Sequence, residues 1–149
     1  MRLVPAVTIQ TATPDSQCVV DVTAEIESAV RASALRQGIC SIFCPHTTCG
    51  LAVTEAEEGL HHDLGDVLEH LAPRGRYWAH DDLARRRANL VPGDRPNGHS
   101  HVRALLATLP QLTVPIIDGA LALGLWQRVF LVELDGGRLR RLLVTAWGE

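Results

Sequence analysis

The last third of the chain alternates apolar and polar residues over three successive stretches, and this pattern constrains the fold more than any other feature. The stretches read LTVPII, ALALGLWQRVFLVEL and RLRRLLVTAW. Turn sequences separate them, DG beginning at Asp118 and DGG beginning at Asp135. Because period-two alternation with Asp-Gly turns is typical of β-hairpins, we predict an antiparallel meander in this region.

Three shorter patterns upstream predict further strands and a helix packed on a sheet. Residues 3–11 alternate loosely, and Pro5 predicts an edge strand or a strand start because proline donates no ladder hydrogen bond. Residues 22–35 carry apolar side chains at helical spacing, and Gly38 follows them as a stop signal. The run ICSIFCP predicts a buried strand that ends at Pro45.

The stretch 54–71 has the clearest helical periodicity, with Thr54 as a candidate N-cap. Its apolar residues form one stripe: Ala56, Leu60, Leu64, Val67, Leu68 and Leu71. At about 100° per residue, Asp63 lies at the margin of that stripe rather than on the opposite, polar face. A carboxylate at such a margin requires a partner or serves a site, so Asp63 is a candidate functional residue.

Residues 73–98 are rich in Pro, Gly, Asp, Asn and Arg and show little periodicity. This composition predicts a long irregular segment or an active-site loop. The whole pattern predicts one domain over residues 1–149. Its fold class is α+β, mostly antiparallel sheet with two or three helices.

Composition excludes several classes of partner and location. A formal net charge of −3 leaves no electrostatic footprint for nucleic acid, and no stretch approaches the roughly 20 apolar residues of a membrane span. The N-terminus lacks the apolar core of a signal peptide, so we expect a cytoplasmic protein. Its cysteines should stay reduced, and the spacing of Cys40, Cys44 and Cys49 lacks the paired knuckles of a zinc ribbon. Cys40 and Cys44 are therefore expected to be small apolar strand residues.

Seven histidines are present, and several have neighbours typical of a metal site. His99 and His101 form an H-x-H pair, whose rings would face one side in an extended segment and could bind one ion. His46 follows the buried strand, and His80 precedes Asp81. These residues favour a divalent metal, zinc foremost, held by His46, His99 and His101, with His80 as an alternative to His46 or His99. The alternatives are solvated loop histidines for the H-x-H pair and a hydrogen-bonded structural role for His46.

Glu55 has two equally weighted interpretations at this stage. It could supply an acid, a base or a metal ligand close to His46, or it could complement the dipole of a helix that begins beside it. Motifs for dinucleotide, P-loop, zincin and serine-hydrolase chemistry are absent from the sequence.

Several segments together resemble the YjbQ family, also described as secondary thiamine-phosphate synthase enzymes. They are HTTCGLAVTEAEEGLHHDL, HDD, NGHSHVRALL, LTVPIIDGALALGLWQRVFLVELD and the terminal GE, in order and spacing over residues 39–149. The resemblance implies an α+β protein whose sheets pack as a sandwich. It also implies a homotrimer with sites near the subunit interfaces, where Trp126, Phe130 and Trp147 would be buried. The alternative is that these three aromatic residues belong to the core of the single chain.

The resemblance also assigns candidate site residues. His46 matches the family's H-T-[ST] histidine, Glu55 the glutamate that follows, and Asp63 the aspartate of the next helix. The remaining matches are His80, Asp81, His99, His101, Trp126 and Gln127, with Arg103 at a basic position after the H-x-H pair. Thr54 and Leu125 depart from the family's usual asparagine and threonine.

Two functions follow as expectations. In the first, the protein forms thiamine phosphate from a pyrimidine diphosphate and a thiazole phosphate, with a metal neutralising the released pyrophosphate and Arg103 contacting phosphate. In the second, it is a metal-dependent hydrolase or a small-ligand binding protein, with Glu55 or Asp63 as general base. Three histidine ligands suit zinc better than magnesium, which prefers oxygen ligands.

Overall fold

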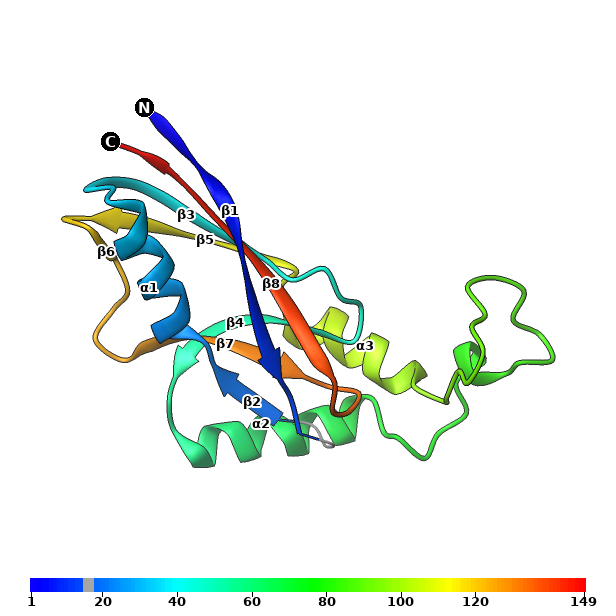
Figure 1. Ribbon diagram of the computed structural model, residues 1–149. Helices are drawn as coiled ribbons and strands as arrows, with labels where there is room; N and C mark the ends of the chain where they lie inside the picture. The colour runs from blue at the N-terminus through cyan, green and yellow to red at the C-terminus, as the bar shows by residue number, and fades with distance from the viewer. Residues whose placement is uncertain (15–17) are drawn as a thin grey trace.

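The computed structural model describes residues 1–14 and 18–149, in which the strands form two antiparallel sheets (Figure 1). Sheet A has the order β1-β8-β3-β5-β6, and sheet B has the order β2-β7-β4. The strands are β1 Arg2–Ala12, β2 Cys18–Asp21, β3 Gln37–Phe43, β4 Cys49–Glu55, β5 Gln111–Ile117, β6 Ala120–Leu121, β7 Gln127–Glu133 and β8 Leu139–Gly148. The helices are α1 Thr23–Ser33, α2 Glu58–Leu71 and α3 Gly98–Ala107, with a short 3-10 helix η1 at Ala79–Asp81. The predicted α+β class is confirmed.

The predicted strands of the last third exist, but the predicted meander is wrong. Strand β3 lies between β5 and β8, and β7 belongs to sheet B, where it pairs with β2 and β4. Alternation fixes which face of a strand is buried, as in β5 and β8, but it does not select the neighbouring strand. The edge position predicted for residues 3–11 is confirmed, since β1 pairs only with β8 in sheet A.

Helix α1 covers sheet A with the apolar face that its sequence predicts. Ile26 and Val30 are buried, and the helix ends at Ala34, which adopts a left-handed conformation with φ 55°. Gly38 is therefore not the stop residue. It lies inside β3, where an added Cβ would come within 2.3 Å of the Trp147 carbonyl oxygen, so glycine permits the close approach of β8.

The predicted helix over 54–71 begins later than its periodicity indicates. Thr54 lies in β4, because this segment pairs with β7 through Glu55 opposite Gln127. Helix α2 starts at Glu58, and the Glu57 carboxylate caps it by accepting hydrogen bonds from the backbone N–H groups of Gly59 and Leu60, both at 2.7 Å. Tertiary pairing with β7 therefore overrode the local helical pattern.

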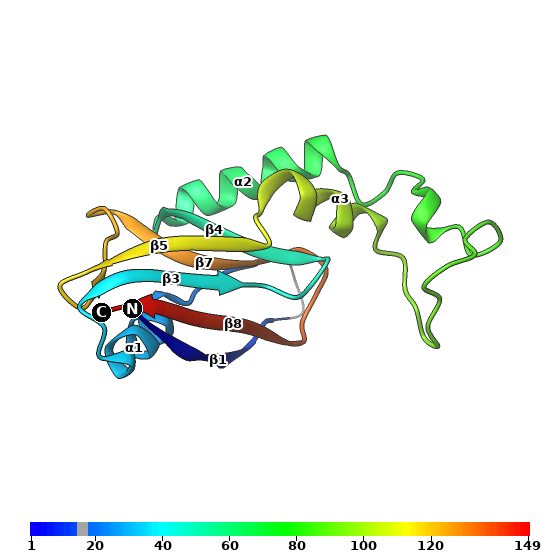
Figure 2. The same cartoon turned by 90° about the horizontal axis from the view of Figure 1, so that it is seen from above.

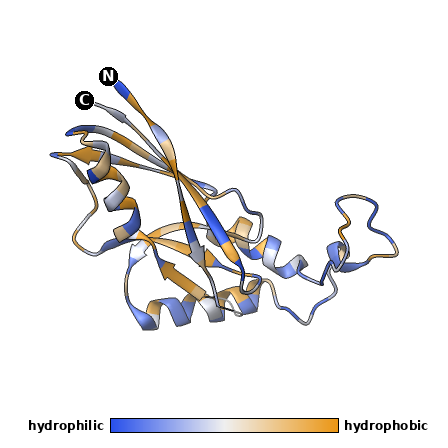
Figure 3. Cartoon of the chain, in the orientation of Figure 1, coloured by the Kyte–Doolittle hydropathy of each residue, from blue (hydrophilic) through white to orange (hydrophobic). Residues whose placement is uncertain are grey.

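The strands and helices form layers around two apolar clusters. Helix α1 lies on one side of the sheets, and α2 and α3 lie on the opposite side (Figure 2). The larger cluster joins both sheets through residues such as Ile42, Leu51 and Val144, and the smaller one packs Leu68 of α2 against Phe130 of β7. Apolar residues concentrate in the strands, whereas much of segment 73–97 is hydrophilic and extends away from the sheets (Figure 3). Among the described residues, no helix is long and apolar enough to cross a membrane.

Candidate functional site

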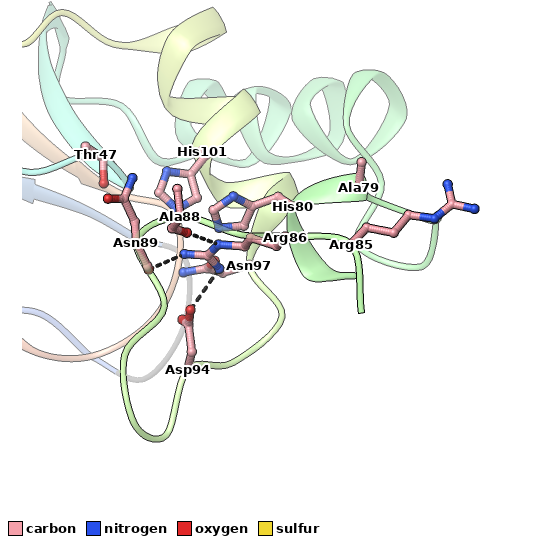
Figure 4. Close-up of a pocket in the computed structure, with 10 residues that line it drawn as sticks. All are labelled: Thr47, Ala79, His80, Arg85, Arg86, Ala88, Asn89, Asp94, Asn97 and His101. Carbon is pink, nitrogen blue, oxygen red and sulfur yellow. Dashed lines mark hydrogen bonds and ion pairs between the residues drawn. The ribbon is translucent and has the colours of Figure 1, made fainter. Parts of the chain in front are cut away.

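Two neighbouring cavities lie where α3, the loop after β3 and segment 73–97 meet. The polar cavity, about 850 Å³, is lined by Thr47, Ala79, His80, Arg85, Arg86, Ala88, Asn89, Asp94, Asn97 and His101 (Figure 4). The apolar cavity, about 550 Å³, is lined by His46, Thr47, Cys49, His101, Ala104, Leu105, Thr108, Leu109 and Pro110. Thr47 and His101 line both, so this histidine stands between a polar and an apolar compartment.

His80 and His101 form a ring pair in the polar cavity. Their ring centroids are 4.5 Å apart and their planes are tilted by 52°. Burial lowers the pKa of His101, the nearby His80 lowers it further, and the negative charge of Asp135 partly opposes this. The imidazole of His101 is therefore held neutral, which is the form that binds metal ions and accepts protons.

Asp81 positions the helix that carries His101. Its Oδ1 accepts hydrogen bonds from the backbone N–H groups of Asn97 and Gly98, both at 2.8 Å. These N–H groups belong to the start of α3 and have no partner within the helix. An added Cβ on Gly98 would come within 2.7 Å of the Trp78 Cβ, so glycine lets η1 approach the helix start. Asp81, a candidate catalytic residue in the sequence, thus holds His80 and His101 together.

Asn97 is a site residue that the sequence interpretation missed. Its side chain is 8% exposed, and Nδ2 donates a hydrogen bond to Asp135 Oδ2 at 3.2 Å. This bond fixes the orientation of the carboxamide and leaves Oδ1 as a buried acceptor without a hydrogen-bond partner. Leaving a buried acceptor unpaired costs about 1–3 kcal/mol, so Asn97 Oδ1 is an unusual feature of this site. The available signal was an Asn-Gly pair just before the H-x-H segment, where asparagine often begins a helix.

The arginines of the polar cavity are not equivalent. Arg86 donates to Asp94 at 2.8 Å and to the carbonyl oxygens of Ala88 and Asn89 at 3.1 and 2.6 Å. Arg85 points away from the cavity into solvent (Figure 4). The positive charge inside the cavity is therefore largely balanced by the Asp94 carboxylate.

The H-x-H pair does not adopt the predicted extended conformation. His99 and His101 lie in the first turn of α3, where residues two apart point about 200° apart around the helix. The ring of His99 is buried against the Ser100 hydroxyl at 3.1 Å, whereas His101 lines the cavities. The two rings therefore do not face one ion, and the predicted geometry for their shared metal site is wrong.

His46 lies in the apolar cavity and has a backbone partner. The N–H of Arg141 donates to His46 Nε2 at 3.0 Å, so this nitrogen acts as an acceptor. Burial lowers the pKa of His46, and the positive charges of Arg140 and Arg141 lower it further. His46 therefore has the structural hydrogen bond considered for it and also lines the apolar cavity together with His101.

Four other candidates lie away from these cavities. Arg103 is buried, donates to the Ala72 carbonyl at 2.9 Å and pairs with Glu69, so it anchors α3 to the end of α2. Asp63 is exposed on α2. Glu55 is exposed at the far end of β4, about 20 Å along the strand from Cys49, and Trp126 lies nearby, 68% exposed before β7.

The predicted three-histidine metal set is not brought together. Across residues 1–14 and 18–149, no group of three or more His, Cys, Asp or Glu side chains has a geometry that could hold a metal ion. What the structure assembles instead is a pair of imidazoles, from His80 and His101, in the same cavity as the Asn97 carboxamide.

The fold and cavities define an α+β protein with paired antiparallel sheets and a histidine-lined cavity at the start of one helix. A family model described as UPF0047 protein YjbQ-like matches residues 7–149. The chain belongs to the YjbQ/UPF0047 family.

Relatives and solved structures agree with this assignment. A UPF0047 protein of Archaeoglobus fulgidus is 35% identical over 128 residues, which cover 86% of this chain and 90% of the relative. YugU of Bacillus subtilis is 27% identical and covers 95% and 98% of the two chains. The crystal structure of a YbjQ-like protein of unknown function from Sulfolobus solfataricus superposes with a TM-score of 0.85 at 30% identity, covering 99% of both chains.

Proposed function

We propose that this protein is a metal-dependent enzyme acting on a small phosphorylated molecule, with a divalent cation bound by His80, His101 and Asn97. One observation carries the proposal: Asn97, whose buried Oδ1 lacks a hydrogen-bond partner, lines the same cavity as two imidazoles whose ring centroids are 4.5 Å apart. A cation would satisfy this oxygen without a proton donor. Two nitrogens and one oxygen suit zinc or a similar transition metal.

The surrounding residues support such a ligand set. Asp135 accepts a hydrogen bond from Asn97 Nδ2, which is the kind of second contact that orients a ligating side chain. Three protein ligands leave coordination positions open for a substrate, and a bound cation would act there as a Lewis acid on a phosphoryl or carbonyl oxygen.

The adjoining cavities favour a substrate with a polar and an apolar part. The polar cavity supplies Asn89 and the Arg86–Asp94 pair, whereas Leu105 and Leu109 line the apolar cavity. Two compartments that meet at His101 also suit a reaction between two substrates. This arrangement keeps thiamine-phosphate synthesis as a candidate beside hydrolysis, although Arg103, the expected phosphate contact, is committed to Glu69.

Metal titration tests the cation site directly. We expect purified protein to bind Zn²⁺ in calorimetry, and His80→Ala, His101→Ala and Asn97→Ala each to weaken binding by at least about tenfold. His62→Ala is the matched control, because His62 is exposed on α2 and contacts Asp66. Equal affinity of His62→Ala and His101→Ala would contradict the proposed ligand set.

An activity assay then separates the two reactions. The protein is incubated with Zn²⁺ and the two thiamine precursors, and then with a panel of phosphate esters. Thiamine phosphate and pyrophosphate as products would identify the transferase, and inorganic phosphate alone would identify the hydrolase. Relief of thiamine auxotrophy by the parent but not by His101→Ala would extend the transferase result to cells. A chain that binds Zn²⁺ and converts none of these compounds would be a binding protein.

The proposal includes a homotrimer. Exposed apolar side chains on α2 and α3 support it, because both helices lie on one side of the sheets (Figure 2). They are Leu60, Val67 and Leu71 on α2 and Leu105 and Leu106 on α3, with Leu109 just after α3. In such a trimer, Glu55 and Trp126 of one subunit could lie close to His101 of a neighbouring subunit. Light scattering should give three times the 16.2 kDa chain mass at micromolar concentration, and a 16.2 kDa particle would refute the trimer.

A further inference from the structure

Two cysteines meet behind the apolar cavity. The Cys44 and Cys49 sulfurs are 3.7 Å apart, and both side chains are almost fully buried. Cys44 follows strand β3 of sheet A, and Cys49 begins strand β4 of sheet B. The two cysteines are therefore the first and last residues of a six-residue segment, 44–49, that connects the two sheets. Cys49 lines the apolar cavity, which gives a small molecule a route to this pair.

We propose that Cys44 and Cys49 are an oxidative modification site, which hydrogen peroxide converts to a reversible disulfide that reshapes the histidine-lined cavities. A disulfide has an S–S distance of about 2.05 Å, so the sulfurs must approach each other by about 1.7 Å from their present 3.7 Å. Side-chain rotation and a small shift of the intervening segment can supply that movement.

The chemistry balances with peroxide as the only co-reactant. The Cys44 sulfur, whose thiol pKa is lowered by the hydrogen bond with Cys49, attacks one peroxide oxygen, the O–O bond breaks, and a sulfenic acid and one water result. The Cys49 sulfur then attacks the Cys44 sulfur, so the S–S bond forms, the S–O bond breaks and a second water leaves. Two thiols are oxidised and one peroxide is reduced. A thiol such as glutathione reverses the reaction by exchange.

The segment between the cysteines is anchored at both ends and exposed in the middle. Cys44 N–H donates to the Pro110 carbonyl at 2.8 Å, and Thr48 accepts from the Leu134 N–H at 3.2 Å and from Arg140 at 3.0 Å. Between these anchors lie His46 and Thr47, which line the cavities. Drawing the two sulfurs together therefore moves cavity walls while the sheets stay in place.

Shared cavity walls connect the pair to His101. Thr47 lies within the ring that the disulfide would close, and Thr47 and His101 line both cavities together. A change in the 44–49 segment therefore alters the surroundings of the His101 ring. Oxidation should therefore change ligand binding at His101 as well as in the apolar cavity.

Mass spectrometry tests disulfide formation without reference to metal binding. After hydrogen peroxide treatment, the intact mass should fall by about 2 Da, reverse with reduced glutathione, and map to a Cys44–Cys49 peptide link. Cys49→Ser and Cys44→Ser should abolish the loss. Cys40→Ser is the matched control, because Cys40 is equally buried, lies in β3 just before Cys44 and should leave the loss intact. No mass loss in the parent protein, or a link through Cys18 or Cys40, would contradict the proposed Cys44–Cys49 disulfide. This result does not depend on whether the variants fold.

A second measurement tests the coupling to the cavity. Mn²⁺ is the probe, because it favours oxygen and nitrogen ligands over thiols and reports on His101 rather than on the cysteines. Its affinity should differ at least threefold between reduced and oxidised parent protein, and not between reduced and peroxide-treated Cys49→Ser. Equal affinities in a parent that carries the mapped disulfide would overturn the coupling. Absence of Mn²⁺ and Zn²⁺ binding in the reduced protein would instead count against the metal proposal.

Discussion

The Asp81 carboxylate lies 2.8 Å from the backbone nitrogen of Gly98 and joins the two ends of the irregular segment between η1 and α3. A second bond of the same length runs from Asn97 N–H to the same oxygen. One carboxylate oxygen thus fixes the position of His80, one residue before it, relative to the helix that carries His101. The 4.5 Å separation of the two rings depends on this contact.

Asp81→Ala should therefore lower both stability and metal affinity. Loss of a helix-capping carboxylate costs about 1–2 kcal/mol, and the freed segment would no longer hold His80 against His101. Urea unfolding and Zn²⁺ calorimetry measure the two effects. Asp82→Ala is the control, because the Asp82 side chain contacts Tyr77, Ala84 and Arg85, all close to it in the chain, and neither Asn97 nor Gly98 among the contacts described. Equal behaviour of the two variants would show that Asp81 does not organise the site.

The buried pair of Glu133 and Arg140 predicts a large stability effect. Arg140 Nε donates to Glu133 Oε2 at 2.6 Å and Arg140 Nη2 to Oε1 at 2.7 Å, with both side chains at most 4% exposed. Burial alone would raise the pKa of Glu133, but the Arg140 hydrogen bonds and backbone N–H groups hold it below its usual value. Arg140→Met leaves this carboxylate unpaired and should cost about 3–5 kcal/mol.

Two further variants test whether the loss of stability comes from an unpaired buried charge. Glu133→Leu combined with Arg140→Met should be less harmful than Arg140→Met alone, because no buried charge remains unpaired. Arg36→Met removes an exposed ion pair with Asp118 at 3.1 Å and should leave the free energy of unfolding nearly unchanged. An Arg140→Met protein that unfolds at the parent's urea concentration would contradict the assignment of a strong buried pair.

Asp63→Asn should have little effect on stability or on metal binding. The helical periodicity placed Asp63 at the edge of an apolar stripe and predicted a functional carboxylate, but the side chain is exposed on α2. We expect the free energy of unfolding to change by no more than about half a kcal/mol, and Zn²⁺ affinity to stay at the parent value. A tenfold loss of Zn²⁺ affinity in calorimetry would show that Asp63 contributes to the metal site.

His99 predicts a dependence of stability on pH. Burial lowers its pKa, and the nearby Arg103 and Arg74 lower it further, whereas an unfolded histidine titrates near 6.5. Below about pH 6.5 the unfolded chain therefore binds more protons than the folded one. The free energy of unfolding should fall as pH drops through this window and level off below the lowered pKa.

The variant His99→Gln tests this dependence. It should flatten the loss of stability between about pH 7 and 5 in urea unfolding, since one histidine contributes at most about 1.4 kcal/mol per pH unit. The slope should not vanish, because the pKa values of His46 and His101 are also lowered. His70→Gln, an exposed change on α2, serves as control. A parent slope retained in His99→Gln would refute the effect.

Local sequence patterns determined the fold class and most of the strands and helices. Strands β1 and β3 were predicted close to their observed bounds because period-two alternation and a buried apolar run depend on each strand's own faces. Helix α1 was predicted because its apolar residues repeat at helical spacing. Motif order along the chain was specific enough to indicate the family, which the match over residues 7–149 confirms.

Tertiary structure alone decided strand neighbours and the composition of the cavity. Strand β3 separates β5 from β8 because sheet pairing depends on contacts between distant residues, which no local pattern encodes. The H-x-H pair became helical because Asp81, from another segment, caps the N–H groups of Asn97 and Gly98. In this helix the His99 side chain is buried, whereas the His101 ring lies against His80. The sequence therefore supplied the histidines, while a contact between residues 81 and 98 selected which of them share a cavity.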